Sequence, residues 1–448
     1  MERETSDFEK WLKETLKEVA PSSFSESLAT VAHSLYRLFS ARVRFAEMLG
    51  RRCSFIAGEV SDEPTCTLPD YIQLTENIIL IVDAWGKLGN EEKEKLIKFL
   101  KEVVKWKRLQ QEISDVASVE KILSGDEDSL LRCADFARRA YCGDAVHIRG
   151  IIEYSNICSR NCLYCGLRKD NKNLKRYTMT VEEILDTAAQ GFDNGIRTFV
   201  LQSGENDSEP PEFLASVIKA LKKNFDVAVT LSAGVKRAEA YRIWKEAGAD
   251  RYLLKFETSS PSLFKRLCSG SVLQNRLSAL ESLRQLEYQI GSGSIIGLPN
   301  QTLSDVAQDI VFAKGLDLDM AAFGPFVPSP HTPFAKCHPG DVALSLRVIA
   351  VARLLLGDVH IAAASSLDAL APNGRQRALS CGANVIMANL TPESYSNLYG
   401  IYPRQNGSSS LKRITEIVSH LGYSIASDRG DSIKQFRRRK NGKVTQRS

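Results

Sequence analysis

Three cysteines stand close together in the chain, whereas the other seven are isolated. They form the pattern Cys158-x3-Cys162-x2-Cys165, with Tyr164 directly before the third cysteine. Thiolates are the ligands of iron–sulfur clusters, so three of them within eight residues could bind three of the four irons of a 4Fe-4S cluster. Because this segment has no fourth cysteine, one iron would stay open for a ligand from outside the protein.

Two other interpretations of these cysteines stay open at this point. A structural zinc site needs four ligands, usually from paired C-x-x-C elements, and here neither a second pair nor a neighbouring histidine is found. The three thiols could also be inert, since a free cysteine often serves as a small buried apolar residue. The spacing favours the cluster over both alternatives.

The elements that would position these cysteines begin near residue 147, where short apolar runs start to alternate with helical stretches. This alternation is typical of βαβ units around a parallel sheet. Strands are predicted over Ile148–Tyr154, Thr198–Gln202, Ala228–Leu231, Tyr252–Phe256, Ser292–Ile296, Ala321–Phe326, Ile361–Ala364 and Asn384–Met387. Helices are predicted between them, among others over Val181–Phe192, Ala238–Ala247, Asn275–Leu286, Leu303–Lys314 and Ala343–Leu356. The sequence therefore predicts an α/β fold, a (βα)8 TIM-type barrel, with a six-stranded partial barrel as the alternative.

In such a barrel, the residues directly after the strands meet at one rim, where barrel enzymes carry their chemistry. The cysteine segment follows the first predicted strand. Glu205 follows the second, Glu257 the fourth and Ser365 the seventh. Polar, ionisable and glycine residues are therefore expected to surround the three cysteines.

The rest of the chain divides into further segments. Residues 1–112 are predicted to be an all-helical N-terminal extension, residues 113–146 a helical lead-in, residues 147–425 the barrel, and residues 426–448 a basic, disordered tail. The helical prediction for the extension rests on apolar spacing such as Leu35, Leu38, Phe39, Val43 and Ala46.

Composition excludes several classes of protein. Apolar residues make up 43% and charged residues 25%, a balance typical of soluble globular proteins. The net charge of +5 includes the run Arg437–Lys440, which is typical of a solvated tail, so nucleic-acid binding is not expected. The longest apolar run, Ile78–Val82, is too short to cross a membrane, and the acidic N-terminus resembles no targeting signal, so a cytoplasmic location is predicted.

The cysteine motif with its aromatic Tyr164 resembles that of the radical S-adenosylmethionine (SAM) enzymes. The resemblance implies that SAM binds the open iron through its amino and carboxylate groups. It also implies that electron transfer releases methionine and a 5′-deoxyadenosyl radical.

The same resemblance implies roles for other residues. Glu205, with Ser203 and Gly204, would bind the methionine ammonium. Glu257 would contact the ribose hydroxyls, and Arg276 would pair with the SAM carboxylate as a bidentate donor. The remaining residues implied to bind the cofactor are Tyr164, Gln202, Thr230 and, beside adenine, Gly297.

Within this superfamily, the segments Ile151–Asn156, Val200–Glu205 and Gly382–Met387 resemble the HydE family, biotin synthase-like maturases of FeFe-hydrogenase. The resemblance implies an anaerobic reaction on an iron–cysteine–carbonyl–cyanide precursor during assembly of the H-cluster. It further implies reduced ferredoxin or flavodoxin as electron donor and other hydrogenase maturases as partners.

Two departures from the family pattern concern the substrate. Lys255-Phe256 stands where the family usually has Arg-His, and lysine lacks the planar fork of arginine. Ala364-Ser365 replaces an expected pair of threonines. Lys255 and Ser365 are therefore the candidate substrate residues. A third departure, the absence of cysteines after Cys381, removes an accessory cluster that is dispensable in the family.

Two alternative functions stay open. One is a methylornithine synthase-like or biotin synthase-like enzyme with another small substrate. The other is a non-catalytic scaffold or carrier that binds a cluster, with residues 1–112 as its docking surface.

Overall fold

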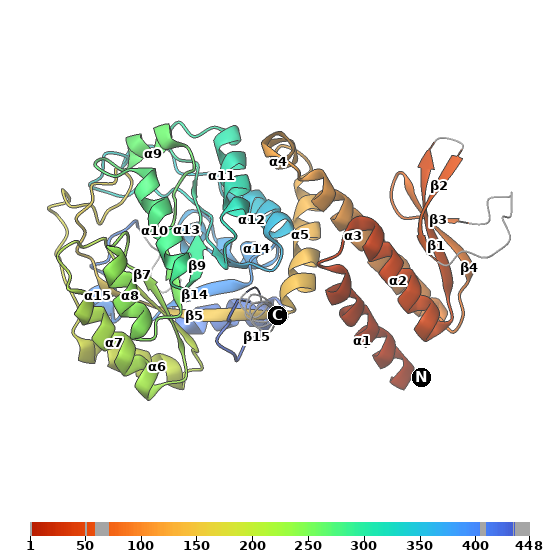
Figure 1. The fold of residues 1–448 in the computed structure, drawn as a ribbon, viewed down its shortest axis with the longest axis horizontal. Helices are drawn as coiled ribbons and strands as arrows, with labels where there is room; N and C mark the ends of the chain where they lie inside the picture. Colours follow the sequence, from red (N-terminus) through yellow and green to blue (C-terminus); the bar gives the residue numbers. More distant parts are fainter. Residues whose placement is uncertain (1, 50–51, 59–70, 404–408, 433, 435–448) are drawn as a thin grey trace, which may run out of the picture. The chain divides into compact units, whose positions relative to one another are not determined.

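The computed structural model of the chain describes residues 2–49, 52–58, 71–403, 409–432 and 434. The chain divides into two compact units, drawn in Figure 1. The first comprises Met1–Ser114 and Arg132–Gly143, and the second comprises Asp115–Leu131 and Asp144–Ser448. Each unit is described by itself.

The second unit is built on a closed parallel barrel. Its eight strands are β5 (Ala145–Ser155), β6 (Thr198–Ser203), β7 (Ala228–Ser232), β8 (Arg251–Leu253), β9 (Gln289–Ser292), β11 (Met320–Ala321), β13 (His360–Ala363) and β14 (Val385–Asn389). Each strand pairs in parallel with the next, and β14 pairs with β5, from Val385 opposite His147 to Asn389 opposite Ile151. This last pairing closes the barrel, so the predicted TIM-type fold is confirmed and the six-stranded alternative is excluded.

Helices connect the strands and lie outside them in Figure 1. They are α6 (Val181–Asp193), α7 (Pro211–Asn224), α8 (Ala238–Glu246), α9 (Pro261–Leu267), α10 (Leu273–Gln285), α11 (Leu303–Gly315), α12 (Val342–Leu356), α13 (Ser365–Leu370), α14 (Gly374–Leu379), α15 (Glu393–Ser396) and α16 (Leu411–His420). Local sequence sets several of their starts. Thr180 caps α6 by accepting a hydrogen bond from Glu183 N while the Glu183 carboxylate binds Thr180 N, and Thr302 and Asp305 form the same capping box on α11. The core between strands and helices is aliphatic and aromatic, as at Phe199 and Leu201, which are fully buried.

Two short strands extend the barrel towards the rim that follows the strand ends. β10 (Ile295–Ile296) and β12 (Gly324–Pro325) pair in parallel just beyond β9 and β11. The prediction had joined each of these short strands to the one before it. The interruption lies at Gly293, whose φ of 156° and close approach to Ala322 O leave no room for a side chain.

At the opposite end of the barrel, the C-terminal segment is bound to the strands. β15 (Ser424–Ile425) pairs with the start of β5, and Asp431 forms an ion pair of 2.8 Å with Arg251, whose side chain is fully buried. Ser432 Oγ donates a hydrogen bond of 2.6 Å to Asp319. The prediction of disorder from residue 426 onward was therefore wrong for residues 426–432, because Asp431 pairs with the buried Arg251 and Ser432 binds Asp319, contacts that no local sequence pattern indicates. The run Arg437–Lys440 lies outside the described residues.

The first unit contains the helices α1 (Glu2–Val19), α2 (Phe24–Phe39) and α3 (Asn90–Glu112), but it is not all-helical as predicted. An antiparallel sheet of order β2-β1-β4-β3 lies between α2 and α3 in the chain. Its strands are β1 (Arg42–Leu49), β2 (Arg52–Gly58), β3 (Tyr71–Gln73) and β4 (Ile78–Ala84).

The prediction failed because it treated one apolar pattern as a single helix face. Ser40 ends α2 in a left-handed conformation, with a φ of 55°. Val43 and Ala46, which the pattern had placed on a helix, therefore lie on β1. β4 begins with five apolar, largely β-branched residues, Ile78–Val82, which favour a strand.

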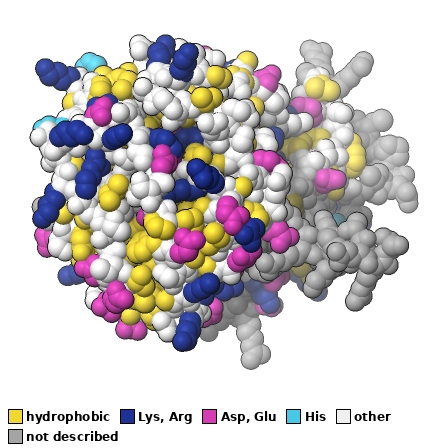
Figure 2. Space-filling view, turned by 60° about the vertical axis from the view of Figure 1, so that its left-hand side comes forward, with side chains coloured by type: hydrophobic (Ala, Val, Ile, Leu, Met, Phe, Trp, Pro, Cys, Tyr) yellow, Lys and Arg dark blue, Asp and Glu magenta, His cyan; other side chains and the backbone are white. Residues whose placement is uncertain are grey.

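The predicted helical lead-in consists of α4 (Val116–Leu123) and α5 (Glu127–Cys142). α4 packs on α11 and α12 of the barrel unit. Among the described residues, every helix is too short or too polar to traverse a lipid bilayer. On the face drawn in Figure 2, Lys and Arg side chains are mixed with Asp and Glu.

Candidate active site

The cysteine segment leaves β5 at Asn156 and is anchored there by that buried side chain. Asn156 Nδ2 donates hydrogen bonds of 2.8 Å to both Lys175 O and Leu398 O, and its Oδ1 accepts one from Tyr177 N. Asn156 is fully buried, so its amide must be satisfied by such partners. The start of the segment is thus tied both to the segment that precedes α6 and to the segment after β14.

Arg176 binds the backbone at both ends of the cysteine segment. Its guanidinium donates to the carbonyl oxygens of Asn156, Leu167 and Arg168 at 2.7 to 2.8 Å. These carbonyls lie on both sides of the three cysteines. One planar group with several donors therefore fixes the curvature of the loop.

The three cysteines differ in their surroundings. Burial raises the pKa of the Cys158 and Cys165 thiols, whereas a hydrogen bond with Cys268 lowers the pKa of Cys162. Cys268 follows α9 and is buried, and the neighbouring backbone bond from Leu163 N to Leu267 O of 2.8 Å brings the two segments together.

In the part of the chain that the structure describes, no group of three or more His, Cys, Asp and Glu side chains is arranged to hold a single metal ion. A closed zinc site would need such a group. A cubane cluster does not need one, because each of its irons takes a separate thiolate. The three thiols and their spacing in the chain are therefore compatible with a cluster.

Glu205 lies beside the cysteine segment, as predicted for the rim. Arg160, between the first two cysteines, donates a hydrogen bond of 2.5 Å to Glu205, and Arg276 Nη2 lies 3.7 Å from the second carboxylate oxygen. Gly204 lets the strand end that carries Glu205 pass close to the cysteine segment, since a Cβ on Gly204 would stand 2.7 Å from Cys158 Cβ. The sequence analysis did not predict a role for Arg160. Its position in a loop expected to face Glu205 could have indicated an ion pair between the two.

Glu257, Arg276 and Lys255 meet after β8. Arg276 Nη1 donates a hydrogen bond of 2.8 Å to Lys255 O. Burial acts against the charge of Arg276, but the carboxylates of Glu257 and Glu205 raise the pKa of its guanidinium. Lys255 Nζ lies 3.5 Å from Glu257 Oε2, and that buried oxygen has no hydrogen-bond partner among the described residues.

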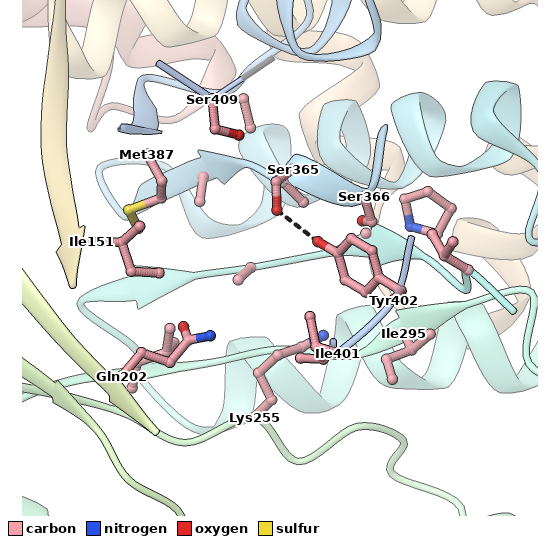
Figure 3. A pocket seen from close by; sticks show the side chains of 18 of the residues that line it. Ile151, Gln202, Lys255, Ile295, Ser365, Ser366, Met387, Ile401, Tyr402 and Ser409 are labelled. Carbon is pink, nitrogen blue, oxygen red and sulfur yellow. Dashed lines mark hydrogen bonds between the residues drawn. The ribbon is translucent and has the colours of Figure 1, made fainter. Parts of the chain in front are cut away.

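A cavity of about 260 Å³ opens inside the barrel beneath this rim, and Figure 3 shows its side chains. Gln202 and Lys255 lie on one side, and Ser365 faces them, joined to Tyr402 by a hydrogen bond of 2.6 Å between their hydroxyls. Tyr164 and Glu257 also line the cavity, together with many apolar side chains. Such a cavity, apolar with a few polar groups, is typical of a small-molecule site.

The sequence reading missed Tyr402. It comes from the segment after β14, well past the last strand, where no spacing rule marks a rim position. Ser203, by contrast, lies after the second barrel strand as predicted, but its hydroxyl lies 2.9 Å from Tyr154 Oη and 2.8 Å from Gly204 O and does not line the cavity. Gln202 donates to Tyr399 at 3.0 Å while lining the cavity.

Thr230 and Gly297 are among the predicted site residues that do not line this cavity. Thr230, in the middle of β7, lines a narrow void of about 20 Å³ inside the barrel, where its hydroxyl has no hydrogen-bond partner among the described residues. Gly297 follows β10 with a φ of 80°, and its N–H donates to Gln301 at 2.7 Å. The structure thus brings together the cysteines, Glu205, Glu257 and Arg276, and places Lys255 and Ser365 in the cavity.

The residues present fit a 4Fe-4S cluster and SAM. Three soft thiolate donors stand on one anchored loop at the rim. The buried Glu257 oxygen without a hydrogen-bond partner is the kind of acceptor that ligand hydroxyls would satisfy. Glu205 and Arg276 provide one group of each charge for a ligand that carries both an ammonium and a carboxylate.

Known proteins resemble this chain in sequence and fold. The family model of the Radical SAM superfamily matches residues 152–313. The FeFe hydrogenase maturase subunit HydE of Thermotoga maritima is 47% identical over 317 residues, 70% of this chain and 91% of that protein. A biotin synthase of Thermotoga petrophila is 29% identical over 208 residues, 46% of this chain and 69% of that enzyme. The crystal structure of methylornithine synthase (PylB) superposes with a TM-score of 0.64 at 23% identity, covering 71% of this chain and 97% of that one, and shows the shared barrel alone.

Proposed function

We propose, for a chain that belongs to the HydE family of radical SAM enzymes, that it cleaves SAM at a 4Fe-4S cluster and acts on an organometallic precursor of the FeFe-hydrogenase H-cluster. Cys158, Cys162 and Cys165 would hold the cluster. When bound, the cluster supplies the electron that splits SAM into methionine and a 5′-deoxyadenosyl radical.

One observation carries the proposal. The loop with the three cysteines lies at the same rim as Glu205, Glu257 and Arg276, and its Tyr164 lines the cavity together with Glu257. A chain that bound a cluster only to store or carry it would not need this set of charges or a cavity. The arrangement therefore supports an enzyme over a scaffold.

The protein groups divide the work of holding SAM. Glu205 would accept hydrogen bonds from the methionine ammonium, with Ser203 and Gly204 shaping the loop around it. Arg276 would pair with the carboxylate, and its raised pKa keeps it charged at any physiological pH. Glu257 would accept hydrogen bonds from the ribose hydroxyls. The other residues proposed to line the SAM site are Tyr164, Gln202, Thr230 and Gly297.

Lys255 and Ser365 would bind the substrate from opposite walls of the cavity. The proposed substrate is an iron–cysteine–carbonyl–cyanide precursor, whose anionic groups suit an ammonium and a hydroxyl. A single ammonium replaces a planar donor fork at Lys255, so this chain would hold the substrate with fewer fixed hydrogen bonds. Reduced ferredoxin or flavodoxin as donor, other hydrogenase maturases as partners and a cytoplasmic location stay predictions.

Cleavage of SAM is tested with the full chain reconstituted anaerobically with iron and sulfide. Incubation with SAM and dithionite should release 5′-deoxyadenosine, measured by liquid chromatography, and the Cys162→Ala variant should release none. Equal amounts from both proteins would refute the enzyme proposal. Deleting the gene should abolish FeFe-hydrogenase activity in the host, and a host without such a hydrogenase would refute the maturase role while leaving SAM cleavage in place.

A further inference from the structure

The segment after β8 carries Glu257 in an unusual backbone conformation. Its φ of 67° lies in the left-handed region, which is unfavourable for a residue other than glycine. Two backbone hydrogen bonds hold it there, from Glu257 N to Gly293 O at 3.1 Å and from Ile295 N to Glu257 O at 2.9 Å. Such conformations persist where the surroundings over-determine them.

Asp309, on α11, binds the next residues of the same segment. Ser259 donates to Asp309 Oδ1 through both its N–H and its hydroxyl, each at 2.6 Å, and Thr258 Oγ1 lies 3.4 Å from the same oxygen. Asp309 is fully buried, and burial raises the pKa of its carboxyl to about 6. Burial thus disfavours the charged carboxylate, and the hydrogen bonds from Ser259 act in the opposite direction.

Gln301 connects Asp309 to a second segment. Its Nε2 donates to Asp309 Oδ2 at 3.4 Å and to Ile295 O at 3.0 Å. Its Oε1 accepts hydrogen bonds from Gly297 N at 2.7 Å and from Leu298 N at 3.2 Å. The amide of Gln301 thus fixes the turn after β10 and ties it to the carboxylate that fixes the segment after β8.

We propose that Asp309 and Gln301 are positioning residues that hold Glu257 and Gly297 at a fixed separation, so that the adenosine part of SAM meets a preformed site. The inference rests on the proposed function, which takes Glu257 and Gly297 as contacts of that part. Asp309 is fully buried and bonded to Ser259, and both polar atoms of the Gln301 amide are bonded to backbone groups, so the two act through the two segments rather than on SAM itself. Preformed contacts avoid the ordering cost that flexible ones pay on binding.

Asp309→Asn is the test, made in the full reconstituted chain. The amide oxygen can still accept from Ser259, but the amide nitrogen cannot accept from Gln301. We expect the dissociation constant for SAM, measured by calorimetry, to rise about tenfold, the KM for SAM to rise with little change in kcat, and the iron content to match wild type.

Asp319→Asn is the matched control. Asp319 is equally buried and likewise accepts from one backbone N–H, that of Ile290 at 2.9 Å, and from one hydroxyl, that of Ser432 at 2.6 Å. It lies at the other end of the barrel, so this variant should lower the unfolding temperature while binding SAM as wild type does. If Asp309→Asn folds poorly, Gln301→Leu should show the same rise in the dissociation constant.

Three outcomes would overturn the inference. The first is that Asp309→Asn and Gln301→Leu both bind SAM with the affinity of the wild type. The second is that the control Asp319→Asn loses as much SAM affinity as Asp309→Asn does. In either case wild-type SAM binding would leave the proposed function standing. The third is a reconstituted wild-type protein that binds no SAM, which would overturn the proposed function together with this inference.

Discussion

Replacing Gly204 by alanine should disturb the cysteine loop without touching a cysteine. A Cβ at this position would stand 2.3 Å from Ile157 O and 2.7 Å from Cys158 Cβ. Gly204 is not among the glycines with a left-handed φ, so alanine can adopt its backbone conformation. The collision alone therefore causes the effect.

The size of the effect follows from what must move. Cβ atoms essentially never approach another atom within 3.0 Å, and the atom in the way is a backbone oxygen that cannot rotate aside. The loop is held by hydrogen bonds from Gly204 N to Ser155 O at 3.3 Å and from Ser159 N to Glu205 O at 2.8 Å. Overpacking costs about 1–3 kcal/mol and one lost hydrogen bond about 1 kcal/mol, so we expect a loss of about 3 kcal/mol.

The assay combines thermal unfolding of the apo protein with iron and sulfide content after anaerobic reconstitution. An unfolding entropy of about 2.1 cal/mol/K per residue over a barrel unit of about 320 residues converts 3 kcal/mol into a shift of about 4 °C. Gly315→Ala is the control, because nothing lies within 4 Å of a Cβ there and the residue ends α11. The control should bind full iron and unfold no earlier than wild type.

The reasoning would be refuted if Gly204→Ala matched Gly315→Ala in both measurements. Loss of iron without a lower unfolding temperature would mean that the loop shifts at little cost, so the estimated energy would be wrong while the coupling to Cys158 would hold.

Three further predictions concern stability and the loop. Asp431→Ala should lower the free energy of unfolding by about 3 kcal/mol, because it leaves the buried Arg251 without its counter-charge. Asp226→Ala removes only an exposed ion pair with Arg429 and should cost under about 1 kcal/mol, so equal urea midpoints for the two variants would contradict this prediction. Burial lowers the pKa of His147 to about 4 and also lowers the pKa of His360, so the unfolded chain binds more protons than the folded one below about pH 6.5. The free energy of unfolding should therefore fall between about pH 6.5 and about pH 4, and unfolding temperatures that stay constant over this range would contradict the prediction. Arg176→Ala should cut iron content after reconstitution by at least half, because the carbonyls around the cysteines lose their shared donor; full iron content would show that the loop keeps its shape without it.

Much of the barrel could be predicted because its signals are local. The helix predicted over Val181–Phe192 is observed over Val181–Asp193, since a capping box marks its start and apolar spacing marks its face. The strand predicted over Thr198–Gln202 is observed over Thr198–Ser203 for a similar reason, a short buried run between helices. Closure of the barrel was an inference from counting such units, and the pairing of β14 with β5 confirms it.

The N-terminal unit could not be predicted in the same way. Its α2 and β1 share a stretch of apolar residues that fits a helical period until Ser40 interrupts it. A left-handed conformation at a serine leaves no clear mark in sequence, because glycine or asparagine is the usual residue there. Tertiary pairing with β4 decided the structure of β1, and pairing partners cannot be read from a local pattern.

The site residues that belong to sequence motifs could be predicted, whereas those on loops outside the motifs could not. The cysteines and Glu205 follow strand ends, which a barrel forces to one rim. Tyr402 and Arg160 owe their places to the path of two loops, and a loop path depends on partners such as Ser365 that are distant in sequence. The pair of Asp309 and Gln301 is of the same kind, since it acts through hydrogen bonds that only the folded chain creates.

The attachment of the C-terminal segment to the barrel has a consequence for the order in which the molecule is made. β5, the first strand of the barrel to leave the ribosome, finds its neighbours β14 and β15 only after the other barrel strands have been synthesised. Arg251 likewise waits for Asp431. Contacts so far apart in sequence form slowly, and until they form both open strand edges and the thiols beside them are exposed. Closure of the barrel therefore depends on contacts between its first and last strands, and the rim that would take up iron is complete only once those contacts have formed.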